Sequence, residues 1–172
     1  SRDGLYAEQF GLLYDRPLSG NDYDGDGKDD LAVVRYTSSS PGSPMPTILY
    51  IRLSGNGTWQ AWNVGDARVT WVVSGDYDGD GKSDVAVWRG RQWLWVRSSD
   101  NRVESANFGE SSDGPLPGDY DGDGKTDPAV IRPLFNYEFH VLQSRDGYKA
   151  VQWGKQGDFV VSSLDRERSL GF

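Results

Sequence analysis

A short acidic segment occurs three times in this chain. The copies begin at Asp22, Asp76 and Asp119, and each has aspartate at positions 1, 3, 5 and 9, glycine at position 6 and lysine at position 7. Self-similarity at an interval of a few tens of residues is typical of arrays in which each repeat packs on its neighbours. The repeat therefore constrains the fold more than any other feature of the sequence.

Each acidic segment is followed by three short segments rich in Val, Ile, Trp and Tyr. Gly, Asp, Asn, Ser and Pro separate these segments, which predicts strands joined by tight turns, and no helical periodicity is evident. With one strand before each acidic loop, four strands recur about every 45 residues, the size of a propeller blade. We call these strands A to D. The expected B, C and D strands are 31–35, 48–53 and 58–64; 85–89, 92–97 and 102–108; and 128–132, 137–143 and 148–153.

The spacing of the aspartates predicts a metal site in each A–B loop. Alternate carboxylates in a curled loop converge on one point, and glycine at position 6 permits the turn that frees the position 7 carbonyl. Four carboxylates so close together repel one another without a cation, and an all-oxygen ligand set favours a hard ion, Ca²⁺ rather than Mg²⁺. The candidate ligands are Asp22, Asp24, Asp26, Lys28 and Asp30; Asp76, Asp78, Asp80, Lys82 and Asp84; and Asp119, Asp121, Asp123, Lys125 and Asp127, the lysines through their backbone carbonyls.

These loops differ from an EF-hand, which needs a glutamate at position 12 and flanking helices. Position 12 is valine in all three copies, so the aspartate at position 9 must close the site.

The net charge of −8 belongs mostly to the acidic loops. Outside the twelve candidate ligand aspartates, 14 acidic residues face 18 Lys and Arg, and no nucleic-acid footprint is indicated.

The motif GDYDGDGKxD followed by an apolar strand resembles the FG-GAP/VCBS-like repeat, which also occurs in the integrin α-subunit propeller. The Phe-Gly pair is present at Phe10-Gly11 and Phe108-Gly109, whereas the Gly-Ala-Pro portion is not evident. The resemblance implies calcium-stabilised β-propeller blades in a secreted or cell-surface protein that serves adhesion or recognition. The N-terminal Ser1-Arg-Asp-Gly-Leu-Tyr6 lacks the pattern of a signal peptide and is interpreted as a mature or excised start.

We expect an all-β fold with three full four-stranded antiparallel blades and partial strands at both ends. The repeat domain over 1–172 divides into a partial strand (1–11), blades at 12–65, 66–109 and 110–154, and a degenerate repeat (155–172). A fourth calcium site is disabled there, because Leu164, Arg166 and Arg168 replace its first three ligands.

Three blades are too few to close a propeller. The array is a piece of a longer propeller, stays open, or is completed by a homo-oligomer, and we favour self-association. Exposed strand edges at an open end would promote such pairing.

An enzyme is not expected. The chain has no cysteine, and its single histidine, His140, has no accompanying base or nucleophile. The favoured function is a structural, adhesion or protein-interaction module. The alternative is a carbohydrate-binding propeller or an accessory domain of a secreted enzyme, with a glycan as ligand.

Two features bear on ligand binding. Most tryptophans are expected to pack in the core. The alternative is that at least one is exposed and stacks on a sugar. The 37–47 insertion between strands B and C of the first blade, on the side opposite the acidic loops, is equally compatible with a binding loop and a spacer. The tryptophans are Trp59, Trp62, Trp71, Trp88, Trp93, Trp95 and Trp153.

Overall fold

The computed structural model describes residues 7–37, 45–66, 71–133, 136–155 and 158. All twelve of its regular elements are β-strands, which form three four-stranded antiparallel sheets. Blade 1 contains β1 (Arg16–Leu18), β2 (Leu31–Tyr36), β3 (Pro46–Arg52) and β4 (Trp59–Asp66). Blade 2 contains β5 (Trp71–Val72), β6 (Val85–Arg89), β7 (Gln92–Val96) and β8 (Val103–Asn107). Blade 3 contains β9 (Gly114–Pro115), β10 (Ala129–Pro133), β11 (Tyr137–Gln143) and β12 (Gly147–Gln152).

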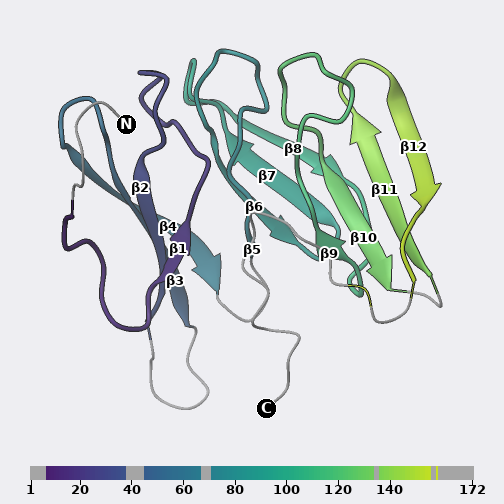
Figure 1. Ribbon diagram of the computed structural model, residues 1–172, viewed down its shortest axis with the longest axis horizontal. Helices are drawn as coiled ribbons and strands as arrows, with labels where there is room; N and C mark the ends of the chain where they lie inside the picture. Colours follow the sequence, from purple (N-terminus) through teal and green to yellow (C-terminus); the bar gives the residue numbers. More distant parts are fainter. Residues whose placement is uncertain (1–6, 38–44, 67–70, 134–135, 156–157, 159–172) are drawn as a thin grey trace.

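The three blades stand side by side in chain order, as expected for propeller-type blades, and the described sheets do not close into a ring (Figure 1). Each blade pairs its strands in the order A, B, C, D. Consequently the acidic A–B loops and the C–D turns share one edge, the upper edge in Figure 1. No helix long and apolar enough to cross a membrane is found in the described part of the chain.

Alternation along the B and C strands places one apolar face of each blade against each neighbour. Val87 on β6 packs against blade 1, in a cluster with Ala32, Leu49 and Ile51. The next residue, Trp88, points the other way and packs with Trp93 and with Val130 of blade 3. A sheet buried on both faces needs apolar residues at consecutive positions, which explains the runs in β2, β6 and β10.

The expected strands agree with the structure to within two residues at most ends, apart from the terminal ones. Residues 7–10, the described part of the expected N-terminal strand, are irregular. A strand is held by a hydrogen-bonded neighbour, and none of the described residues provides one there. The partial strand expected at the C-terminal end (159–163, within the degenerate repeat), the disabled loop residues Leu164, Arg166 and Arg168, and most of the 37–47 insertion lie outside the described residues.

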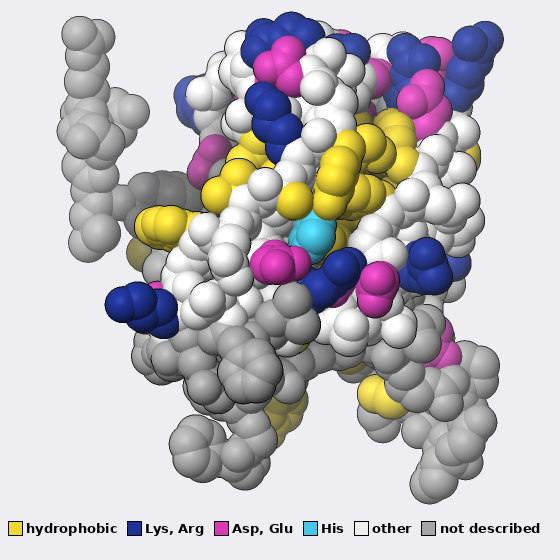
Figure 2. All heavy atoms as spheres, turned by 90° about the vertical axis from the view of Figure 1, so that its right-hand side faces the viewer, with side chains coloured by type: hydrophobic (Ala, Val, Ile, Leu, Met, Phe, Trp, Pro, Cys, Tyr) yellow, Lys and Arg dark blue, Asp and Glu magenta, His cyan; other side chains and the backbone are white. Residues whose placement is uncertain are grey.

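The tryptophans divide between core and surface. Trp88 and Trp93 are buried, and Trp62, Trp71 and Trp95 pack partly buried against the two apolar clusters. Trp59 and Trp153 are exposed. Viewed from the blade 3 end of the row, hydrophobic side chains lie open on the surface among charged ones (Figure 2). Tyr148, Val151 and Trp153 are among the exposed apolar residues of blade 3.

Candidate metal sites in the acidic loops

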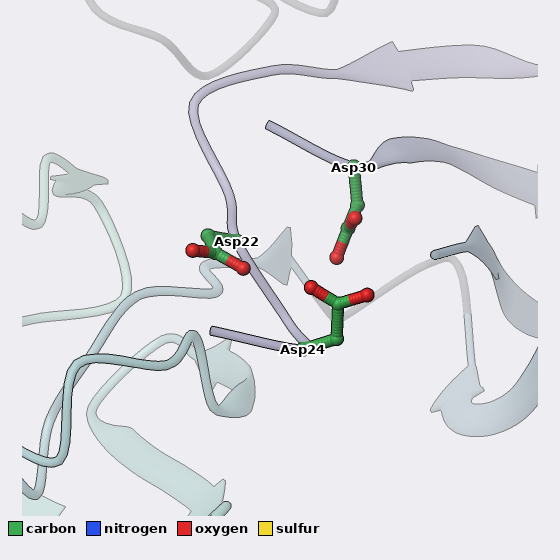
Figure 3. Close-up of side chains that lie close together, drawn as sticks. All are labelled: Asp22, Asp24 and Asp30. Carbon is green, nitrogen blue, oxygen red and sulfur yellow. The ribbon is translucent and has the colours of Figure 1, made fainter. Parts of the chain in front are cut away.

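Each A–B loop brings three carboxylates together. In loop 1 the side chains of Asp22, Asp24 and Asp30 turn toward a common point (Figure 3). In every loop, carboxylate oxygens from positions 1, 3 and 9 lie within 4.8 Å of one another. The three clusters are Asp22, Asp24 and Asp30; Asp76, Asp78 and Asp84; and Asp119, Asp121 and Asp127.

The aspartate at position 1 curls the loop around itself. Asp22 accepts hydrogen bonds from the backbone N–H of Gly25 at 2.6 Å and of Gly27 at 2.7 Å. Both glycines have positive φ, 79° and 80°, a conformation that a side chain would strain. Asp76 and Asp119 make the same contacts in their loops. The loop shape is therefore built from its own residues.

The aspartate at position 9 ties the acidic loop to the C–D turn of its blade. Asp84 is fully buried, and it accepts the backbone N–H of Tyr77 at 3.0 Å and of Ser98 at 2.7 Å. Asp30 and Asp127 are buried in the same way and accept the same pair of bonds. Burial raises the pKa of Asp84, although the two backbone bonds oppose this effect. These carboxylates could offer a metal only the lone pairs left by those bonds.

The aspartate at position 3 faces the C–D turn, and its surroundings differ among loops. Asp24 accepts the backbone N–H of Gly55 at 3.0 Å. Asp78 instead contacts the Ser99 hydroxyl and the Arg97 guanidinium, at 3.2 Å from Nε. Burial would raise the pKa of Asp78, but these two hydrogen bonds lower it overall. Loop 2 therefore carries a cation beside its carboxylates, whereas the residue at the Arg97 position in blade 1 is the buried Leu53.

The predicted ligands at positions 5 and 7 are not part of these clusters. Asp26, Asp80 and Asp123 accept the backbone N–H of the lysine two residues later, at 2.8 to 2.9 Å. The Asp26 carboxylate also pairs with Lys28 Nζ at 2.9 Å, and this bond lowers the pKa of Asp26. Ligation by the carbonyls of Lys28, Lys82 and Lys125 has no support in the structure and stays a prediction.

An aspartate–arginine pair that the sequence reasoning missed braces two of the blades. Asp15 accepts two hydrogen bonds from Arg35, both 2.7 Å, and Asp113 accepts two from Arg132, both 2.9 Å. Each aspartate follows a positive-φ glycine by four residues, Gly11 and Gly109. The spacing Gly-x3-Asp was the available signal, but the second repeat breaks it with Val69.

Replacing Asp15 with asparagine is expected to destabilise the protein by about 1–3 kcal/mol near neutral pH, because a part-buried bidentate ion pair is lost. The Arg35 hydrogen bond lowers the pKa of Asp15 below its ordinary value of 3.8, although burial opposes it. The pair therefore stabilises the fold above that value, and its contribution disappears as the pH falls through the lower folded-state pKa. Urea unfolding of both proteins between pH 2.5 and 7 measures this. A stability difference that does not shrink below about pH 4 would contradict the assignment.

The structure is a row of β-blades, and in each blade an acidic loop is hydrogen-bonded to the C–D turn at one edge. Residues 22–87 match the family model described as FG-GAP-like repeat, which supports an FG-GAP-like repeat in this part of the chain. The match runs from loop 1 through the rest of blade 1 into β6. No curated protein and no solved structure gives a significant match. An FG-GAP-like repeat suggests a structural or protein-interaction role.

The donor set fits a hard divalent cation. All three groups in each cluster are carboxylates, and oxygen ligands are those that calcium and magnesium prefer. Three carboxylates with oxygens within 4.8 Å repel one another strongly, and a cation between them reverses that repulsion. The clusters are therefore candidate metal sites of the same kind, repeated once per blade.

Proposed function

We propose that this chain is a calcium-stabilised repeat module of the extracellular space, with a structural, adhesion or protein-interaction role. The observation that carries the proposal is the threefold recurrence of one carboxylate cluster in an FG-GAP-like setting. A single acidic turn is common on protein surfaces, whereas three with the same hydrogen bonds at positions 1 and 9 are consistent with a shared ligand.

Calcium is preferred over magnesium because three carboxylates converge at each described site, whereas magnesium is usually held by one or two carboxylates and several waters. Loop carbonyls or water would complete the shell. Calcium accepts six to eight oxygens in loose geometry, whereas magnesium requires a near-ideal octahedron. The role of the ion is to hold the A–B loop closed against the C–D turn. Catalysis is not proposed.

Direct calcium titration tests the proposal. We expect three ions per chain, and Asp24→Asn should remove or weaken the loop 1 site alone, because Asp24 is a cluster member and not part of the core. Asp29→Asn is the matched control, since Asp29 is in the same loop, exposed and outside the cluster. Equal calcium binding by the two variants would argue against the assigned ligands.

Carbohydrate binding is the second candidate, and the exposure of Trp59 and Trp153 favours it. Trp59 is 58% exposed and lies over Phe10 with ring centroids 4.9 Å apart, and Trp153 is 74% exposed. Open aromatic faces can stack on sugars, although exposed tryptophans also occur at protein interfaces. Glycan-array binding that Trp59→Ala and Trp153→Ala abolish would favour this function over protein interaction.

A further inference from the structure

The contact between neighbouring acidic loops is the same at both junctions of the row. The Ser83 N–H donates to the Asp22 carbonyl at 2.6 Å, and the Thr126 N–H donates to the Asp76 carbonyl at 2.5 Å. These donors occupy position 8 of one loop and the acceptors position 1 of the loop before it. A standard docking geometry therefore joins each blade to the next.

The lysine at position 7 completes this geometry. Lys82 lies over Gly25, and Lys125 lies over Gly79, with the lysine Cε 2.9 Å and 2.8 Å from where a glycine Cβ would be. A side chain at these glycines would displace the lysine. Each loop thus offers a carbonyl and a bare glycine to the blade that follows.

At the two ends of the row, the part of the chain that the structure describes provides no partner blade for the same groups. Among the described residues nothing lies within 4 Å of the Cβ position of Gly122, the glycine of loop 3 that corresponds to Gly25 and Gly79. At the other end, the Lys28 side chain is 70% exposed and turns back onto Asp26 of its own loop. Blade 3 therefore presents the carbonyl and the glycine of the contact, and blade 1 presents the lysine and the N–H donor.

A second feature repeats on blade 1. The residues that line a small cavity between blades 1 and 2 have equivalents on blade 1, and these line a larger cavity. Between blades 1 and 2 a cavity of about 150 Å³ is lined on the blade 2 side by Ser83, Val85, Val96, Ser98 and Asn101, among others. The sheet register pairs Leu31 with Arg52 as it pairs Val85 with Val96. The corresponding blade 1 residues Asp29, Leu31, Arg52, Ser54 and Gly57 line a larger cavity of about 620 Å³, to which Ala7 and Glu8 also contribute.

Blade 3 carries the residues that would fill this cavity. Blade 1 closes the internal groove with Tyr23, Gln60 and Trp62. By strand register the equivalent residues of blade 3 are Tyr120, Lys149 and Val151. Tyr120 is 42% exposed and Val151 is 56% exposed. Lys149, which lies 3.5 Å from Asp146 of its own blade, would face the exposed Asp29 of the cavity, where Glu8 is already paired with Arg52 at 2.6 Å.

We propose that blade 3 of one copy binds blade 1 of a second copy, head to tail, through this repeated contact. Lys28 then lies over Gly122 of the other copy, and the Asp29 N–H donates to its Asp119 carbonyl. Such a heterologous contact generates either a ring or an open filament. Two copies supply six blades, which is within the range of closed propellers. The proposal names the interaction surface of the proposed function and does not require bound calcium.

Two variants that block opposite ends test the proposal. Leu31→Arg places a charge in the blade 1 cavity, and Val151→Arg places one on the blade 3 face. Both residues are partly exposed, 42% and 56%, so the fold is retained, which thermal melting verifies. Val103→Arg is the matched control, since Val103 is 67% exposed on β8 of the middle blade.

Sedimentation equilibrium up to about 200 µM protein, with calcium and with EGTA, provides the measurement. We expect the wild type and the control to associate, and each end variant to associate at least ~10-fold more weakly, because a bulky arginine replaces an apolar side chain at the contact and keeps the two blades apart. An equimolar mixture of Leu31→Arg and Val151→Arg should form a dimer, since each retains the end that the other lacks.

A wild type that stays monomeric throughout, end variants that associate like the control, or a mixture that does not pair would each overturn the proposal. Metal content, measured on the same samples, separates this outcome from a failure of the calcium assignment. A monomer that holds three calcium ions refutes only the head-to-tail contact. An assembly that holds no calcium refutes only the metal assignment.

Discussion

Removal of calcium with excess EGTA is expected to lower the melting temperature by roughly 10 °C. A site with a dissociation constant of about 0.1 mM in about 1 mM calcium contributes roughly 1.4 kcal/mol to the free energy of unfolding. Three such sites contribute about 4 kcal/mol, and about 1 kcal/mol corresponds to 2–4 °C in a chain of this size. Differential scanning calorimetry with and without the chelator measures the shift.

The structural reason is electrostatic. Without a cation, each cluster keeps three carboxylates with oxygens within 4.8 Å. One of them, at position 9, is buried and connects its loop to the C–D turn. Calcium should restore the melting temperature after chelation, and magnesium at the same concentration should restore less of it. A melt that EGTA leaves unchanged, in protein shown to be free of calcium, would contradict a stabilising role for the ion.

Truncation of Trp93 to alanine is expected to cost about 3–5 kcal/mol, the usual range for a large buried aromatic residue. Trp93 is fully buried between blades 2 and 3, and its Nε1–H donates to the Phe108 carbonyl at 3.1 Å. Its ring also lies 6.2 Å from that of Trp88. The variant therefore opens a cavity at an interface between repeats and leaves the Phe108 carbonyl to the longer, 3.5 Å hydrogen bond from Trp88 Nε1.

Trp153→Ala is the control for this experiment, because Trp153 is exposed and should change stability by no more than about 0.5 kcal/mol. Urea unfolding at low micromolar protein and saturating calcium gives both values. Equal costs for Trp93→Ala and Trp153→Ala would show that the interface between blades 2 and 3 contributes little to the fold.

The strands and the loop positions were predictable because they are local features. A strand buried on both faces needs a short apolar run, and β2, β6 and β10 each follow an acidic loop within one or two residues. Because the segment recurs, the same prediction of strands and loops applies to blade 2 and blade 3. Convergence of positions 1, 3 and 9 was likewise expected from the loop spacing alone.

Contacts between distant residues could not be predicted in the same way. The Asp15–Arg35 pair joins residues 20 apart, and its spacing pattern fails in the second repeat. The packing of Lys82 on Gly25 depends on how one blade lies against the next, which no local pattern specifies. Ligation by the position 5 aspartates stays a prediction. In the structure the position 5 carboxylate accepts a backbone N–H of its own loop and lies outside the three-aspartate cluster.

Isothermal titration of the calcium-free protein with calcium, together with native mass spectrometry, is the most direct test of calcium binding by the acidic loops. We expect three calcium ions per chain, and two for a variant in which Asp24 is replaced by asparagine. A chain that binds no calcium at millimolar concentration, or that loses no ion on this substitution, would contradict it.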